Sequence, residues 1–212
     1  ANNINLVTAT HFVSQVAEAL VKAKNKGLVI PVVYNSSAYE NVSTLKILDG
    51  LVDVYLPDMK YIDSRLSAEY SKAPDYADVA KAAIQEMVRQ TGKPEFFTDD
   101  DELVKSGSVE AGIMKKGVIV RHLVLPGTTK DSKAVIKYLL DTYADEIYIS
   151  IMSQYTPFDR LKNHPLLSRK VTRKEYDSVV DYAIECGINN GFIQEGDVAE
   201  ESFIPEFDYE GI

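Results

Sequence analysis

The sequence predicts an α/β protein built as a partial (β/α) barrel, with parallel strands inside and helices outside. Short β-branched runs alternate with longer stretches of helical period along most of the chain. The strands are nearly continuous apolar runs, which is typical of a parallel sheet covered by helices. No glycine-rich phosphate loop of the G-x-G-x-x-G or G-x-x-x-x-G-K type follows any strand. That absence weighs against a nucleotide-binding open sheet and favours a barrel.

Five strands are expected, each followed by a helical or irregular segment. They lie at residues 4–7, 28–35, 52–56, 117–127 and 146–153. In the second strand Pro31 indicates a bulge or a strand start, because proline cannot donate to the sheet.

Helices are expected between these strands and after the last one. Their ranges are 11–27, 42–48, 76–92 and 131–143, and a last helix ends at Gly187. Thr172 and Glu175 form a capping box that opens the last helix. Residues 92–116, with the acidic run TDDDE, are interpreted as a solvated loop, since they lack the ligand spacing and glycine of a calcium-binding loop.

One repeating unit runs through most of the chain, so one domain is expected for 212 residues. Residues 1–190 are assigned to a truncated barrel and residues 191–212 to a C-terminal tail packed on it.

Composition excludes several classes of function. Hydrophobic residues make up 45% and charged residues 26%, while the net charge of −9 argues against nucleic acid or an anionic membrane as the main partner. The sequence shows no transmembrane run and no signal peptide. A single cysteine fits a reducing compartment, so a soluble cytoplasmic protein is expected.

Polar side chains follow every predicted strand at its carboxyl end, where ligands bind in parallel α/β folds. The candidate site residues are Thr8, Thr10, Asn35, Ser36, Asp58, Lys60, Arg121 and Gln154. A purely structural barrel would not need polar groups at all five ends.

Asp58 and Lys60 directly follow the third strand. Residues two apart on an extended segment face the same way, so the carboxylate would hold the ammonium charged and oriented. That arrangement suits the binding of a carboxylate ligand. It does not suit a neutral amine nucleophile.

Arg121 and His122 alternate on the fourth strand, so only one of them faces the interior. An inward Arg121 requires an anionic partner, from a ligand or from another strand. His122 is then expected to be a packed histidine with a local hydrogen bond. Cys186 shares a helical face with Val179 and Ala183, which predicts a buried, inert thiol, and no zinc site is expected.

Six segments resemble one known family. NINLVTATHF, IPVVYNSSAYE, LDGLVDVYLPDMKY, VRHLVLPG, IMSQYTP and ESFIPEFD are, in order, similar to segments of the radical S-adenosylmethionine proteins described as pyruvate formate-lyase activating enzyme homologues. The resemblance covers almost the whole chain.

The resemblance implies a partial (β/α)6 barrel that binds S-adenosylmethionine and a [4Fe–4S] cluster. The first family strand is followed by a loop with the motif C-x-x-x-C-x-x-C, whose thiolates hold the cluster. Reductive cleavage of S-adenosylmethionine then yields a radical that abstracts hydrogen, in activating enzymes from a glycine of a partner enzyme. A glycyl radical enzyme or another protein substrate, and a reductant such as flavodoxin or ferredoxin, are the implied partners.

The resemblance also implies roles at the strand ends. Lys60 would reach the methionyl carboxylate, and Asp58 would orient it or hold a cation. Asn35 and Ser36 would lie near the methionyl or ribose side, and Arg121 would face inward. Gln154 would stand where activating enzymes carry a histidine near the adenosine. Thr8 and Thr10 stand where relatives carry a carboxylate that binds the amino group.

The cluster motif is absent from the sequence, which offers about five of the six βα units. The cluster-bearing unit is therefore expected upstream of Ala1, the catalytic residues stay unknown, and the chain as given is expected to be inactive and to hold neither cofactor firmly. An incomplete barrel leaves a strand edge unpaired. We expect the tail or a second copy to cover it.

Two other functions fit parts of the sequence. One is a cluster-free barrel that binds a protein or another ligand. The other is an aldolase-like barrel with Lys60 as a Schiff-base lysine, which leaves Asp58 beside it unexplained.

Overall fold

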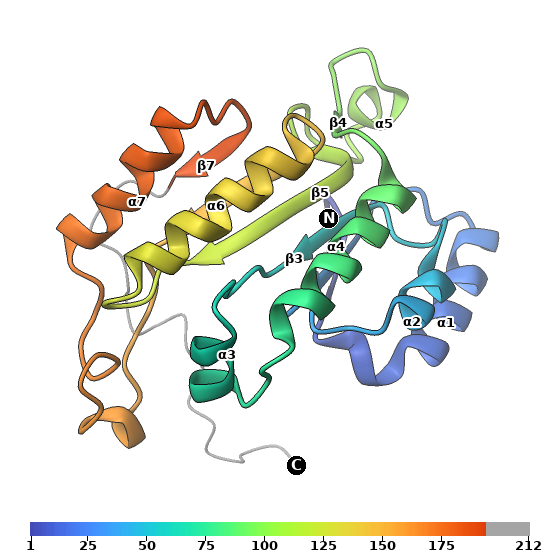
Figure 1. The fold of residues 1–212 in the computed structure, drawn as a ribbon. Helices are drawn as coiled ribbons and strands as arrows, with labels where there is room; N and C mark the ends of the chain where they lie inside the picture. Colours follow the sequence, from blue (N-terminus) through green and yellow to red (C-terminus); the bar gives the residue numbers. More distant parts are fainter. Residues whose placement is uncertain (194–212) are drawn as a thin grey trace.

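The computed structural model describes residues 1–193 and has one seven-stranded sheet with helices packed against it (Figure 1). Six strands are parallel and follow one another across the sheet in the order β1-β2-β3-β5-β6-β7. Their bounds are β1 Ile4–Val7, β2 Val32–Ser36, β3 Val54–Pro57, β5 Met114–Leu123, β6 Tyr148–Met152 and β7 Gly191–Ile193. The short β4 (Glu95–Phe96) pairs with β5 in the antiparallel direction.

The helices join the strands and cover one face of the sheet (Figure 1). The main ones are α1 Val13–Asn25, α4 Tyr76–Thr91, α6 Thr129–Tyr143 and α7 Arg173–Glu185. Shorter ones are η1 Ala9–Phe12, α2 Val42–Leu45, η2 Lys46–Leu48, α3 Ser64–Ser71, α5 Glu102–Lys105 and η3 Asp159–Leu161. Parallel strands that follow one another in the sequence also lie side by side in the sheet, as in a barrel. Among residues 1–193 the sheet is open, since β1 and β7 each pair with a single strand there, so the predicted partial barrel is confirmed.

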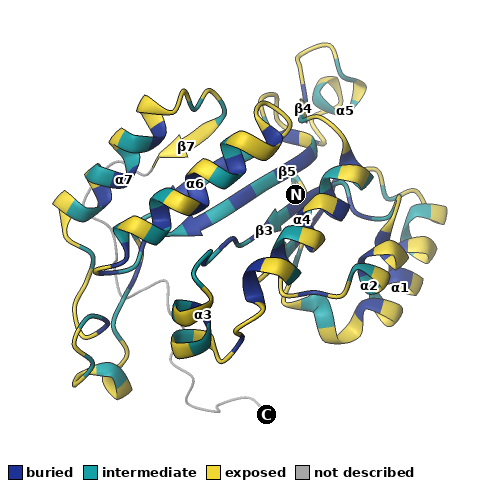
Figure 2. Ribbon diagram, in the orientation of Figure 1, coloured by how far each residue is buried: buried dark blue, intermediate teal, exposed yellow. Residues whose placement is uncertain are grey.

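The core lies between the sheet and the helices. Strand side chains alternate, so that Ile149 and Ile151 of β6 are buried under the helices, whereas Tyr148, Ser150 and Met152 are only half-buried on the opposite face. Figure 2 shows a similar alternation of buried and intermediate residues along β5. The largest fully buried side chains include Tyr34, Tyr55, Leu45, Ile84, Met87, Ile136, Leu139 and Ile147. We call the opposite, half-exposed face the inner face.

All five predicted strands are present, with adjusted bounds. β2 begins at Val32, directly after Pro31, whose carbonyl accepts a hydrogen bond from the Ile4 N–H at 2.9 Å. The predicted capping box is also present, because Thr172 and Glu175 bond reciprocally at the start of α7.

Other elements are additional to the predicted ones. Asp63 caps the unpredicted α3 by accepting a hydrogen bond from the Arg65 N–H. β4 and α5 form within residues 92–116, which were expected to be a loop. β7 takes up the first residues of the predicted tail, and residues 194–212 of that tail lie outside the described residues.

The prediction of a buried thiol at Cys186 is wrong. Cys186 is exposed, because α7 ends at Glu185 and the cysteine occupies the C-cap, beyond the buried turns around Val179 and Ala183. No helix within residues 1–193 has the length and apolar character needed to cross a membrane.

Candidate functional site

Three neighbouring strands bring the central candidate residues together at the carboxyl edge of the inner face. Asn35 near the end of β2 lies opposite Leu56 of β3, and Asp58, just past β3, pairs with Arg121 of β5. β3 and β5 are adjacent although residues 58–113 lie between them in the chain. The sheet topology, rather than local sequence, therefore creates this cluster.

Asp58 lies between two cations. Its Oδ1 is 2.7 Å from Nη2 of Arg121, and its Oδ2 is 3.7 Å from Nζ of Lys60. The turn that holds it is fixed by the backbone, since the Asp58 N–H donates to the Ser36 carbonyl and the Met59 N–H donates to the Arg121 carbonyl, each at 2.9 Å. As predicted, Asp58 and Lys60 face the same way and Arg121 meets a carboxylate from another strand.

Arg121 has more hydrogen-bond donors than its contact with Asp58 uses. Its Nη2 also donates to Oδ1 of Asn35 at 2.7 Å, which directs the Asn35 amide nitrogen away from the guanidinium. Its Nε is buried without a hydrogen-bond partner. Asp58, Lys60 and Arg121 together carry one net positive charge, so the cluster has the donors and the charge to bind an anion.

Tyr76, at the start of α4, supports the turn from the helix side. Its hydroxyl accepts a hydrogen bond from the Lys60 N–H at 3.1 Å and lies 2.8 Å from the Asp58 carbonyl and 2.9 Å from the Ser37 carbonyl. Burial raises the pKa of Tyr76 above its ordinary value, so the hydroxyl stays protonated. In the sequence Tyr76 is only the first residue of the helix predicted over 76–92, which gives no sign of these hydrogen bonds.

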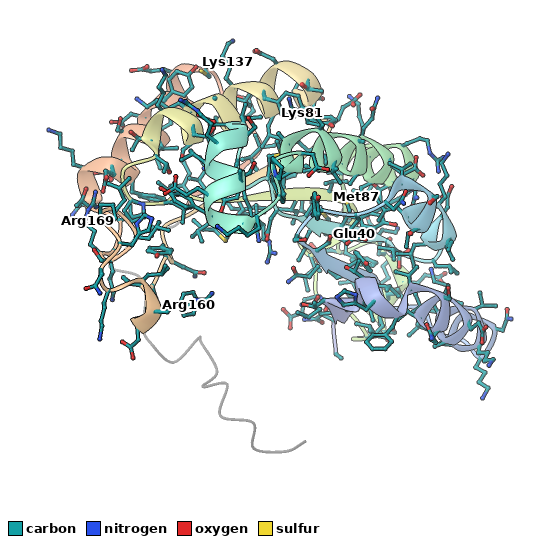
Figure 3. All side chains as sticks on the ribbon, turned by 60° about the horizontal axis from the view of Figure 1, so that its bottom comes forward. Glu40, Lys81, Met87, Lys137, Arg160 and Arg169 are labelled. Atoms are coloured by element: carbon teal, nitrogen blue, oxygen red, sulfur yellow. The ribbon has the colours of Figure 1, made fainter. Side chains whose placement is uncertain are left out.

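Thr10 and Ser36 belong to a second polar cluster, on the helix side of the sheet, centred on Glu40. The Glu40 carboxylate accepts hydrogen bonds from Thr10 at 3.1 Å, from Tyr34 at 3.1 Å and from Ser36. Glu40 is buried, and Figure 3 shows it in the packed interior. Burial raises the pKa of Tyr34, and the neighbouring Glu40 charge acts in the same direction. Sequence reasoning missed Glu40, whose only signal was a carboxylate soon after a strand end.

The side chains of the remaining two candidates join neither cluster, although the Thr8 N–H donates to the Asn35 carbonyl at 3.4 Å. Thr8 is exposed and has the left-handed backbone conformation (φ 56°) between β1 and η1. Gln154 is exposed after β6. The described contacts join neither of them to Asp58.

His122 faces the helices, as predicted. Its Nδ1 lies 2.8 Å from the Met59 carbonyl, and its Nε2 is buried without a partner. Burial lowers the pKa of His122 to about 4, so the ring is neutral at pH 7. His122 therefore packs behind the turn and is not part of the inner face.

Metal ligands do not cluster in the part of the chain that the structure describes. Within residues 1–193 no three His, Cys, Asp or Glu side chains are placed to hold a metal ion.

Comparison with known proteins finds similarity both by sequence and by structure. No known family model matches the chain. The uncharacterized protein MJ0674 of Methanocaldococcus jannaschii is 28% identical over 154 residues, which are 73% of this chain and 38% of that protein. This chain therefore spans well under half the length of that relative.

Two solved structures superpose on this chain. A domain of pyruvate-formate lyase-activating enzyme from Bacteroides vulgatus superposes with a TM-score of 0.55 and 10% identity, over 91% of this chain and 98% of that one. A radical SAM methyltransferase from Sphaerobacter thermophilus matches more weakly, with a TM-score of 0.49 and 10% identity, over 89% of this chain and 57% of that one. The first match establishes a shared fold, so the fold implied by the family resemblance is confirmed.

Proposed function

We propose that this chain is the S-adenosylmethionine-binding part of a radical S-adenosylmethionine enzyme that resembles the activating enzymes of glycyl radical enzymes. Its fold is shared with a domain of one such enzyme. The observation that carries the proposal is the cluster of Asn35, Asp58, Lys60 and Arg121 at the carboxyl edge of three adjacent parallel strands.

The cluster fits the carboxylate end of S-adenosylmethionine. The side chain of Lys60 is 40% exposed, so its ammonium is accessible from solvent. Asp58 pairs with both Lys60 and Arg121, and its negative charge offsets the repulsion between the two cations. A ligand carboxylate can then accept charge-assisted hydrogen bonds from Lys60 and from the amide of Asn35.

The iron–sulfur cluster does not fit the residues present. Three thiolates are required, whereas the printed sequence holds one cysteine, which is exposed at the end of α7. No step through the cluster is assigned to this chain. In the proposed assembly the cluster ligands come from another polypeptide segment, and S-adenosylmethionine supplies the hydrogen-abstracting chemistry.

The partners follow from this assignment. We propose a glycyl radical enzyme or another protein as the hydrogen donor, and flavodoxin or ferredoxin as the reductant. The chain's own residues hold and orient the methionyl group, and the oxidoreductase activity belongs to the longer protein.

A cluster-free ligand-binding module is the second candidate. The shortage of cysteines favours it, and it would use the same anion-binding edge. A Schiff-base role for Lys60 is less well supported, because the Asp58 carboxylate 3.7 Å away favours the ammonium over the neutral amine that a nucleophile requires.

Equilibrium dialysis of the 212-residue chain with labelled S-adenosylmethionine tests the proposal, at protein concentrations high enough to measure the weak binding expected of this part of the enzyme. Lys60→Met keeps the length of the side chain and removes its charge. We expect it to weaken binding by about tenfold, the effect of losing one charge-assisted hydrogen bond.

Lys137→Met is the matched control. Lys137 also pairs with an aspartate, Asp141 at 2.9 Å, but it points outward from α6 (Figure 3). Equal affinities for the Lys60 and Lys137 variants, or no binding by the unaltered chain, would count against the proposal.

A further inference from the structure

The segment that carries Asp58 and Lys60 has no regular secondary structure of its own between the end of β3 and the start of α3. Its backbone N–H groups donate instead to four different elements of the fold. The acceptors are the carbonyl of Ser36 in β2, the carbonyl of Arg121 in β5, the hydroxyl of Tyr76 in α4 and the carboxylate of Asp131 in α6. Long-range contacts therefore set the position of Lys60.

Asp131 makes the contact from α6. Its Oδ1 accepts a hydrogen bond from the Asp63 N–H at 2.7 Å, and its two oxygens lie 3.2 Å and 3.3 Å from the backbone nitrogen of Ile62. Ile62 comes only two residues after Lys60 in the chain. One carboxylate thus holds the backbone just beyond the residue that we assign to the ligand.

The environment of Asp131 explains why a carboxylate suits this place. It is half-buried in the first turn of α6, where the helix dipole favours a negative charge. Burial raises the pKa of Asp131, whereas the hydrogen bonds from Asp63 and Ile62 lower it. A half-buried carboxylate is costly unless hydrogen-bond donors compensate it, and here the donors are the two backbone N–H groups.

We propose that Asp131 is a positioning residue for Lys60. It holds the chain after Lys60, while the Arg121 carbonyl holds the chain before it through the Met59 N–H. A lysine side chain is flexible, so a fixed backbone limits the positions that its ammonium can reach and keeps it where a ligand carboxylate can meet it. The assignment rests on the proposed function, because that function gives Lys60 its ligand.

A binding cycle with Lys60→Met tests the proposal. Asp131→Leu removes both acceptor oxygens, and the misplaced Lys60 should then bind S-adenosylmethionine about tenfold more weakly, as when its charge-assisted hydrogen bond is lost. Because Asp131 acts through Lys60, adding Asp131→Leu to Lys60→Met should cause no further loss. Full affinity in Asp131→Leu, or losses that multiply in the double variant, would overturn the proposal.

Asp141→Leu is the matched control. Asp141 is an exposed carboxylate of the same helix, and it pairs with Lys137 at 2.9 Å. Its substitution should leave the affinity unchanged. A loss as large as that in Asp131→Leu would assign the effect to α6 as a whole and overturn the positioning role.

Amide hydrogen exchange tests the proposal without a ligand. The reporter is the Lys60 N–H, which donates to Tyr76 and not to Asp131. Its exchange should be faster in Asp131→Asn, which keeps the shape of the side chain but offers one neutral acceptor oxygen, and faster still in Asp131→Leu. An unchanged rate in Asp131→Asn would overturn the positioning role. A faster rate, in a protein whose unaltered chain does not bind S-adenosylmethionine, would support that role and count against the proposed function alone.

Discussion

Asp58 and Arg121 meet across neighbouring strands, with Oδ1 and Nη2 2.7 Å apart and both side chains at least three-quarters buried. The pair is not isolated, because Nζ of Lys60 lies 3.7 Å from the other oxygen of the same carboxylate. The pair fixes the end of β3 against β5 and sets the charge of the inner edge.

Asp58→Asn should destabilise the fold. The substitution keeps the shape of the side chain and leaves Arg121 and Lys60 close together without a carboxylate. Loss of a charge-assisted hydrogen bond to a partly buried group corresponds to about 2 kcal/mol of unfolding free energy. Urea denaturation measures this change, and Asp141→Asn, which breaks an exposed pair on α6, should leave the midpoint unchanged. Equal midpoints for the two variants would contradict a structural role for the Asp58–Arg121 pair.

Ser36→Ala should affect stability and not ligand binding. Ser36 is buried and donates to Glu40 on the helix side, away from the inner face. Removing the donor leaves the buried carboxylate with fewer partners, at a cost of about 1–3 kcal/mol. Thermal or urea unfolding measures the loss, and dialysis with S-adenosylmethionine should give an unchanged affinity. A large loss of affinity with normal stability would return Ser36 to the ligand site.

A double-substitution cycle tests the second polar cluster. Tyr34 and Ser36 both donate to Glu40, so the effects of Tyr34→Phe and Glu40→Gln on unfolding free energy should not be additive. Tyr143→Phe, a change in a tyrosine of α6, should be additive with Glu40→Gln. Additive effects in both pairs would show that Glu40 is not the centre of this cluster.

His122 predicts a pH dependence of stability. Its pKa is lowered from 6.5 to about 4 by burial, so the folded protein favours the neutral ring. The stabilisation is complete above the unfolded-state pKa of 6.5 and is lost as the pH falls from there toward 4, where the unfolded chain binds a proton that the folded chain does not. The unfolding free energy should fall by roughly 3 kcal/mol over this range.

His122→Asn is the test of that assignment. The asparagine amide can replace the hydrogen bond to the Met59 carbonyl without titrating. The slope between pH 6.5 and 4 should be reduced in this variant, and His11→Asn, at an exposed position, should retain it. An unchanged slope in His122→Asn would assign the titration to other groups.

Cys186 should react rapidly in the native protein. Its exposure at the end of α7 gives reagents access to the thiol. A chromogenic disulfide reagent should therefore modify one thiol per chain at a similar rate in buffer and in denaturant. Slow modification in buffer alone would restore the buried thiol that the helical spacing predicted.

The sequence predicted the strands and the capping box correctly, because each depends on residues that are close together in the chain. The apolar runs around Val32, Tyr55 and Ile149 predicted their strands, because these side chains pack against the helices and such positions are apolar. The capping box of Thr172 and Glu175 depends on residues three apart, and it formed as expected.

Long-range contacts were less predictable. The inward position of Arg121 predicted that it needs an anionic partner. The identity of that partner, Asp58, depends on β3 lying beside β5, which the sequence alone does not predict. Glu40 accepts a hydrogen bond from Thr10 because the loop after β2 brings the carboxylate close to the segment after β1. A contact between residues 30 positions apart could not be predicted from the local sequence. Cys186 was misassigned because helical periodicity carries no information about where a helix ends, and α7 stops one residue earlier.

The central claim is that Lys60 contacts the carboxylate of S-adenosylmethionine, and one binding cycle tests it directly. Isothermal titration compares S-adenosylmethionine with its decarboxylated analogue, each on the unaltered chain and on Lys60→Met. A direct contact predicts that the substitution weakens only the ligand that has the carboxylate, with a coupling of about 1.5 kcal/mol. Equal effects on both ligands, and hence a coupling near zero, would contradict the claim.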